Sequence, residues 1–313
     1  MATNFPTNID TFTDQTSSDL ITSAKWNNLQ DSIEALEIKV GADNSTVTTS
    51  HDYKIDALET AIDTKPTKRS ADITVTVGSG GDYSTINAAL AALSAYYPIY
   101  VSGGFTATIS LLTGFEMAEQ VLVSGIDLSW ITITSVDAEV TITRSALTTA
   151  FEGRYPVFGA RRGKLPVISA LFNMDTSGTG TDRDGIYVTD GAGASISSGC
   201  GVKNAGGTGL NVASAGYANA SRSNFSGSDI CLGCAAAGRV YANGATLTGA
   251  TTRGVYVIGG GMANIVSANC QKGGSPAASD IVVATGGIVF AGSATGGLSQ
   301  TANTVTAAGI IFQ

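Results

Sequence analysis

The residues with the clearest potential for chemistry lie in an irregular, charged segment, residues 146–184. Within it, Asp182, Arg183 and Asp184 are consecutive. A carboxylate beside a cation can act as a general acid or base, and two carboxylates can hold calcium for a lyase that uses an arginine as its base. A solvated loop with local ion pairs has the same composition, and the spacing is not specific to catalysis. We therefore favour the loop interpretation and keep these three residues as the only catalytic candidates.

Other catalytic and metal-binding chemistries lack the residues that they need. The only histidine, His51, lies far along the chain from that segment, which argues against histidine-activated nucleophiles and histidine-rich metal sites. Cys231 and Cys234 have the spacing of half a zinc or redox site, but no second pair and no histidine accompanies them. We expect the cysteines to be buried free thiols, and we expect no metal and no cofactor.

The element that must position any site is a repeat. From Asp184 onward, a Gly or Asp is followed by an apolar, a variable and an apolar residue at intervals of roughly 23 residues. The copies are Gly185–Val188, Gly209–Val212, Asp229–Leu232, Gly254–Val257 and Asp280–Val283. A second glycine follows in each copy and opens another short strand. Short strands bounded by glycine at this period predict a solenoid whose turns stack on one shared core.

Alternation along each strand assigns an inside and an outside to the repeat. The first strand has aliphatic residues at the inward positions, namely Ile186, Leu210, Ile230, Val255 and Ile281, then Val188, Val212, Leu232, Val257 and Val283. The second strand has small inward residues, which are Ser195, Ala218, Val240, Ala263 and Val289. Its outward columns are Ala194, Tyr217, Arg239, Met262 and Ile288, and Ile196, Asn219, Tyr241, Asn264 and Phe290.

These outward columns have the chemistry of a carbohydrate-binding surface. The C–H faces of a sugar stack on aromatic rings, and sugar hydroxyls bond to amides. Our candidates for glycan contact are Tyr217, Asn219, Arg239, Tyr241 and Asn264. An interface with another subunit is enriched in Tyr and Arg as well, and from composition alone we favour an interface over a sugar site.

The N-terminal region is predicted to be helical after an extended arm at residues 1–16. Residues 17–19 offer capping side chains, and apolar residues then recur at spacings of three and four up to Gly41. This heptad-like seam comprises Trp26, Leu29, Ile33, Leu36 and Val40. We expect the seam to mediate oligomerisation and attachment. A second helix is expected from Ser50 to Pro66, and an intrachain helical hairpin is the alternative use of the two apolar stripes.

These signals divide the chain into two regions. Residues 1–70 form the arm and helices, and residues 71–313 form a mainly β body. A short alanine-rich helix at residues 84–94 closes the first turn of that body, and residues 146–184 interrupt its rhythm.

Charge and hydropathy narrow the range of partners. The net charge is −8, and residues 186–313 hold three acids against five bases, so we expect no nucleic-acid partner. The three acids, Asp190, Asp229 and Asp280, are too dispersed for the carboxylate pair of a glycoside hydrolase. The chain shows no leader pattern and no apolar run of about 18 residues, so we expect no signal peptide and no membrane insertion.

Several short segments resemble known families. Val77–Leu90 resembles the entry into right-handed parallel β-helices of the pectate-lyase-like group. Phe5–Thr13, Asp31–Gly41 and Val47–Ser50 resemble the start of fibre and spike proteins of tailed phages, and Asn303–Phe312 is similar to the last turn of such proteins. The resemblance implies a spike or fibre of a phage, or of a phage-like particle of the gene-transfer-agent type, with a right-handed, single-stranded parallel β-helix as its body.

On this resemblance we expect a protein of the virion surface that is made in the host cytoplasm and projects from the tail or the head. It would be a homotrimer that attaches to other virion proteins through its N-terminal region, and its body would bind host cell-surface polysaccharide during adsorption. One alternative is a polysaccharide depolymerase, either a lyase or a glycoside hydrolase, that uses residues 146–184. The other is a purely structural decoration. We expect binding rather than catalysis.

Overall fold

The chain divides into two units, Met1–Thr67 and Lys68–Gln313. A computed structural model describes residues 22–40, 46, 48–63, 67–69, 71–98, 105–176, 182–270, 279–294, 304–305 and 309–312. The predicted arm at residues 1–16 lies outside these residues. The chain is mainly β, its large sheets are parallel, and helices are present in the N-terminal unit, as predicted.

The described part of the first unit contains two helices. Helix α1 spans Ser23–Val40 and α2 spans His51–Asp63. Both begin beside a hydroxyl: Lys25 N donates to Thr22 Oγ1 at 3.3 Å, and Tyr53 N donates to Ser50 Oγ at 3.2 Å. Each bond satisfies an amide that has no partner inside the first helical turn. The second helix therefore starts at the predicted serine. The capping residues predicted for the first helix, residues 17–19, lie outside the described residues.

The apolar seam of α1 is exposed in the single chain. Helix α1 contains no buried residue. The exposed fractions of the seam are 55% for Trp26, 47% for Leu29, 48% for Ile33, 49% for Leu36 and 50% for Val40. Ile55 and Leu58 of α2 are exposed as well. Helix α2 thus does not cover the seam as a helical hairpin would, and an apolar stripe of this kind favours association with another helix.

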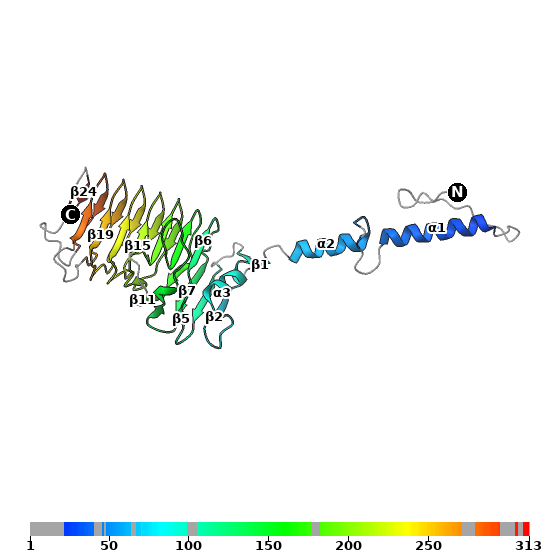
Figure 1. The fold of residues 1–313 in the computed structure, drawn as a ribbon, viewed down its shortest axis with the longest axis horizontal. Coiled ribbons are helices and arrows are strands. Elements are labelled where there is room, and N and C mark those ends of the chain that lie inside the picture. Colours follow the sequence, from blue (N-terminus) through cyan, green and yellow to red (C-terminus); the bar gives the residue numbers. More distant parts are fainter. Residues whose placement is uncertain are drawn as a thin grey trace. The chain divides into compact units, whose positions relative to one another are not determined.

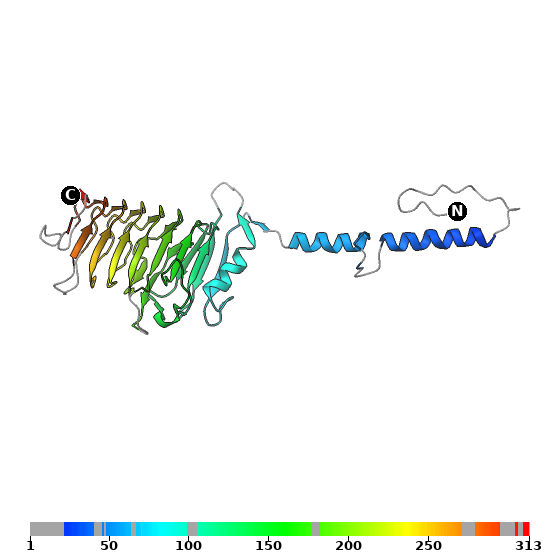
Figure 2. The ribbon, with the colours of Figure 1, turned by 45° about the horizontal axis from the view of Figure 1, so that its top comes forward.

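Four parallel sheets make up most of the second unit (Figures 1 and 2). One has the order β10 (Val167–Ser169), β7 (Ile131–Ser135), β4 (Ala107–Leu111) and β2 (Ile73–Val77). Another has the order β14 (Gly201–Lys203), β11 (Leu171–Met174), β8 (Val140–Ile142) and β5 (Glu116–Met117). A smaller sheet joins β1 (Thr67–Arg69) to β3 (Tyr96–Pro98).

The two longest sheets run across the predicted repeats. The eight-stranded sheet has the order β23 (Thr304–Val305), β21 (Ser279–Val283), β19 (Arg253–Val257), β17 (Ile230–Cys234), β15 (Thr208–Val212), β12 (Ile186–Thr189), β9 (Phe158–Arg161) and β6 (Val121–Ser124). The six-stranded sheet has the order β13 (Gly193–Ser195), β16 (Tyr217–Asn219), β18 (Arg239–Tyr241), β20 (Met262–Asn264), β22 (Ile288–Phe290) and β24 (Ile310–Phe312). Each strand pairs with the strand at the equivalent place in the next repeat.

The register of the eight-stranded sheet corrects the third copy in both predicted inward columns. Leu210 pairs with Leu232, and Leu232 pairs with Val255, so the third copy aligns two residues later than predicted. Ile230 instead lies opposite Thr208 and is only half-buried. The buried inward residues of this sheet are Ile186, Leu210, Leu232, Val255 and Ile281, then Val188, Val212, Cys234, Val257 and Val283. In the five repeats, the two inward columns of this sheet are therefore aliphatic apart from one thiol.

A short helix packs on the core at the N-terminal end of the second unit. Helix α3 spans Ile86–Leu93, and its buried face comprises Ile86, Ala89, Leu90 and Leu93. The Glu119 carboxylate accepts hydrogen bonds from Ile86 N at 2.6 Å and Asn87 N at 3.0 Å. Burial raises the pKa of Glu119, while these bonds to the helix N-terminus oppose the rise. The carboxylate thereby ties the helix to a later part of the chain.

From Gly216 onward, the second glycine of each repeat is required by a close backbone approach. A Cβ added at Gly238 would lie 2.6 Å from Val212 O, and one at Gly261 would lie 2.6 Å from Cys234 O. Real Cβ atoms do not approach a carbonyl oxygen so closely, and the oxygen belongs to a core strand that cannot move freely. The glycine column predicted from the sequence therefore marks where one repeat passes over the end of the strand before it.

We expect Gly261→Ala to lower the free energy of unfolding by about 1–3 kcal/mol, the usual effect of overpacking. Gly292→Ala is the matched control, because a Cβ at Gly292 would meet only Val266 Cγ2 at an ordinary 3.9 Å. Chemical denaturation followed by far-ultraviolet circular dichroism measures both. Equal stability of the two variants would show that the backbone contact at Gly261 is not tight.

Candidate binding face

The candidate face is the outer side of the six-stranded sheet. Its inward column is Ala194, Ala218, Val240, Ala263 and Val289, all buried. In the first repeat the observed register differs from the prediction by one residue, because Gly193 pairs with Tyr217 and Ser195 pairs with Asn219. Ala194 thus points inward, Ser195 is exposed, and Ile196 is buried instead of lying on the outer face. The other predicted outward residues lie on the outer face.

The structure brings the five glycan candidates together on three neighbouring strands. Tyr217 lies opposite Arg239 on the adjacent strand. Two residues further along the strands, Asn219, Tyr241 and Asn264 form a second row across the sheet. Since strands of a sheet lie about 4.7–4.9 Å apart, these side chains are within reach of one small ligand. We call Tyr217, Asn219, Arg239, Tyr241 and Asn264 the polar end of the face.

Two tyrosines provide the aromatic surface of the polar end. The rings of Tyr217 and Tyr241 have centroids 5.9 Å apart and planes inclined by 52°. Their exposed fractions are 44% and 45%, so each presents ring surface to solvent. This pair offers two apolar shelves at an angle, with phenolic hydroxyls at their rims.

The two asparagines are oriented by the chain itself. Asn219 Oδ1 accepts from Ser221 Oγ at 3.1 Å, and Asn264 Oδ1 accepts from Val266 N at 3.2 Å. Because each amide oxygen is engaged, the amide nitrogen is the group left to serve a ligand, as a donor. No hydrogen bond from either amide nitrogen occurs within the described residues. The polar end is accordingly richer in donors than in acceptors.

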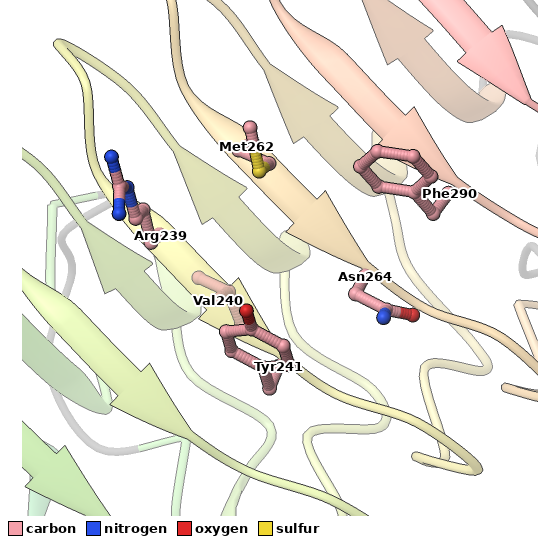
Figure 3. A pocket seen from close by; sticks show the side chains of 6 residues that line it. All are labelled: Arg239, Val240, Tyr241, Met262, Asn264 and Phe290. Carbon is pink, nitrogen blue, oxygen red and sulfur yellow. The ribbon is translucent and has the colours of Figure 1, made fainter.

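A small hollow opens beside the polar end (Figure 3). Its volume is about 50 Å³, and its lining consists of Arg239, Val240, Tyr241, Met262, Asn264 and Phe290. Figure 3 shows Tyr241 and Asn264 at corresponding places on adjacent strands, with Arg239 and Met262 at the preceding outward positions. The hollow thus combines donor groups with apolar walls.

Toward the C-terminus the same face becomes apolar. Phe290 stacks on Phe312 with centroids 5.1 Å apart and planes 12° apart, and Ile288 pairs with Ile310. We call these four residues the apolar end. Ile310 and Phe312 were missed by the sequence analysis, although Gly309 to Phe312 repeats the pattern of Gly287 to Phe290. The outer face therefore has a polar, aromatic end and an apolar end.

The structure does not bring the catalytic candidates together as a site. Asp184 has no exposed surface, which corrects the solvated-loop interpretation for this residue. Its carboxylate contacts Arg154 Nη1 at 3.0 and 3.1 Å and accepts from Thr208 N at 2.8 Å and Asn211 Nδ2 at 3.2 Å. Burial raises the pKa of Asp184, and the Arg154 guanidinium opposes that rise. A substrate could not reach a carboxylate enclosed in this way.

The neighbouring candidates lie on the surface with local partners. Asp182 is half-exposed and lies 3.4 Å from its neighbour Arg183. The Arg183 guanidinium lies 4.3 Å from the ring centre of Tyr155, in cation–π geometry. This pair has the local contacts of an ordinary surface loop, and no buried or strained geometry sets it apart.

The cysteines are free thiols, as predicted. Cys231, Cys234 and Cys270 are buried, whereas Cys200 is half-buried and departs from the prediction. Burial raises the pKa of Cys231 to about 12 and that of Cys234 to about 11, which suppresses the reactive thiolate. Within the described residues, no three His, Cys, Asp or Glu side chains gather where they could hold a metal ion.

Comparison with known proteins does not assign the chain to a family. No protein-family model matches the sequence, and no curated protein matches it. In the part of the chain that the structure describes, no helix is long and apolar enough to cross a membrane.

Proposed function

We propose that Lys68–Gln313 winds as a right-handed, single-stranded parallel β-helix of the pectate-lyase-like kind. Support comes from the strand order, because the chain visits the eight-stranded and the six-stranded sheets in turn and returns to each one strand further on. Parallel strands joined by such crossovers are right-handed in about 98% of cases. Helix α3 closes the first turn of this body.

The body serves to bind polysaccharide on a cell surface through the polar end. The observation that carries this proposal is the exposed pair Tyr217 and Tyr241, flanked by asparagine donors on a rigid sheet. A sugar ring needs an apolar shelf and nearby amides, and a stack of paired strands holds both in place without loop ordering. The five residues of the polar end include no carboxylate, which favours binding over depolymerisation at this face.

The chain as a whole is a spike or fibre on the surface of a phage or phage-like particle. Its N-terminal region attaches it to other virion proteins, and the seam of α1 joins copies into a homotrimer. Support comes from the sequence resemblance and from the exposed heptad of α1. An antibody against the chain should label such particles in electron micrographs, and unlabelled particles from producing cells would contradict this placement.

We expect Tyr217→Ala and Tyr241→Ala each to weaken binding to extracted host polysaccharide about tenfold or more, as for central aromatic contacts in other interfaces. Tyr256→Ala is the matched control. Tyr256 belongs to the eight-stranded sheet and packs against Arg253, whose guanidinium lies 4.2 Å from its ring centre. Biolayer interferometry on immobilised polysaccharide gives the affinities.

Incubation of the chain with the extracted polysaccharide separates binding from depolymerisation. New reducing ends or unsaturated uronate absorbance that disappear in Asp182→Ala would establish an enzyme in place of the binding function. Polysaccharide binding that is equal in all three tyrosine variants would move the binding site away from this face. If no polysaccharide binds at all, the chain is a structural decoration.

A further inference from the structure

We propose that the sugar bound at the polar end carries a carboxylate, and that Arg239 is the residue that recognises it. This inference rests on the proposed function and narrows it to an acidic polysaccharide. The first observation is the position of Arg239. It is exposed, and it lies between Tyr217 and Met262, which occupy the paired positions on the two adjacent strands. No ion pair joins it to another described residue.

The charge on the face has a single source. Arg239 is the only charged residue in the six described strands of the six-stranded sheet. Two acids of the repeats have other partners. Asp190 Oδ2 lies 3.7 Å from Arg162 Nη2, and Asp229 Oδ1 accepts a hydrogen bond from Thr251 Oγ1 at 2.5 Å. Asp280 lies in a strand of the eight-stranded sheet. No carboxylate of the described face competes with a ligand for the guanidinium.

The groups around Arg239 suit an acceptor group rather than another donor. The guanidinium presents donors in a planar fork, and Asn264 has its amide oxygen engaged with Val266 N, which leaves its nitrogen as a donor. Tyr241 lies two residues from Arg239 on the same face of β18, and both residues line the hollow. A charge-assisted hydrogen bond from the guanidinium to a carboxylate is roughly twice as strong as a neutral one.

The size of the hollow selects a substituent. At about 50 Å³ it has room for one or two water-sized groups, not for a sugar ring. A carboxylate fits this volume and matches the guanidinium fork with two parallel hydrogen bonds. Its single negative charge balances the single cation, whereas a phosphate monoester would bring nearly two charges to one guanidinium.

The test uses an array of neutral, uronate-bearing, sialate-bearing, sulfated and phosphorylated oligosaccharides, probed with the full chain. We expect the bound members to carry carboxylates. Reduction of those carboxylates to alcohols should weaken binding about tenfold to hundredfold. Arg239→Gln should produce the same loss on the intact sugar and no further loss on the reduced one. Arg239→Lys should fall between, because it keeps the charge and loses the fork.

Arg253→Gln is the control, since Arg253 lies on the eight-stranded sheet and should not affect binding. Neutral sugars bound as tightly as acidic ones, or preferred sulfated or phosphorylated members, would overturn the carboxylate assignment while leaving polysaccharide binding in place. Binding of no sugar at all would instead overturn the proposed function. Wild-type affinity of Arg239→Gln for the intact sugar, with the loss on carboxylate reduction retained, would place the carboxylate contact at another residue.

Discussion

We expect Arg154→Ala to lower the free energy of unfolding by about 3 kcal/mol at neutral pH, because it removes the cation from a fully buried carboxylate. Asp184 depends on this partner, and the Arg154 side chain is 40% exposed, which keeps the effect near the lower end of the range for buried pairs. Arg162→Ala is the control, since Arg162 is 71% exposed and pairs with Asp190 at the surface. Its loss should cost at most about 1 kcal/mol.

The effect of Arg154→Ala should depend on pH with a definite sign. Burial raises the pKa of Asp184 in the folded chain, so the folded state holds a proton more tightly than the unfolded state. The free energy of unfolding then falls as the pH rises through the folded pKa, and Arg154→Ala enlarges this fall by removing the opposing charge. Toward about pH 4 the carboxyl becomes protonated in both states, and the difference from wild type should narrow.

A double variant tests whether the unpaired charge of Asp184 causes the loss of stability. Adding Asp184→Asn to Arg154→Ala should restore part of the lost stability at neutral pH, because the amide needs no cation. Chemical denaturation across the pH range measures all four proteins. A penalty that is the same for Arg154 and Arg162, or that grows toward acid, would contradict the buried-charge explanation.

We expect Ile33→Lys to dissociate the oligomer and Ile38→Lys to leave it intact. Ile33 lies at the centre of the α1 heptad, at the position that Trp26 and Val40 occupy in the adjacent heptads. Ile38 lies on the same helix outside the seam. The two isoleucines are similarly exposed in the single chain, at 48% and 54%, so they differ mainly in position.

The size of the effect follows from burial at the seam. Each copy of Ile33 that packs between helices contributes about 1.5–3 kcal/mol, so charges there should raise the dissociation constant at least about a hundredfold. Sedimentation velocity over a range of concentrations measures it. Wild-type assembly of the Ile33 variant would show that the seam does not hold the copies together. Monomeric behaviour of the unmodified chain would revive the intrachain use of the two helices.

Much of the architecture could be predicted because the repeat constrains it directly. The aliphatic columns and the glycine column follow from strand alternation and close backbone approach, and both are visible as periods in the sequence. The register of the third copy could not be obtained this way. A shift of two residues keeps every side chain on its own side of the strand, so alternation does not distinguish Ile230 from Leu232 as the partner of Leu210.

The error at Ala194 has a different cause. Placing Gly193 in the same column as Gly216 would put Ala194 opposite Tyr217, whereas the alternation of Ala192, Ala194 and Ile196 indicates the register that the structure has. The burial of Asp184 could not be inferred locally, because its partners Thr208 and Asn211 belong to the next repeat. Charged neighbours in sequence made the segment look solvated, while contacts from elsewhere in the chain enclose it.

The register between neighbouring repeats determines how such a chain can lengthen or shorten over evolutionary time. Because each outward residue lies opposite its equivalent in the next repeat, one additional repeat would lengthen the face by about 4.7–4.9 Å and give the core only contacts that it already makes. The number of repeats therefore sets the length of the outer face. Chains that gain or lose whole repeats would change that length without a redesign of the interior.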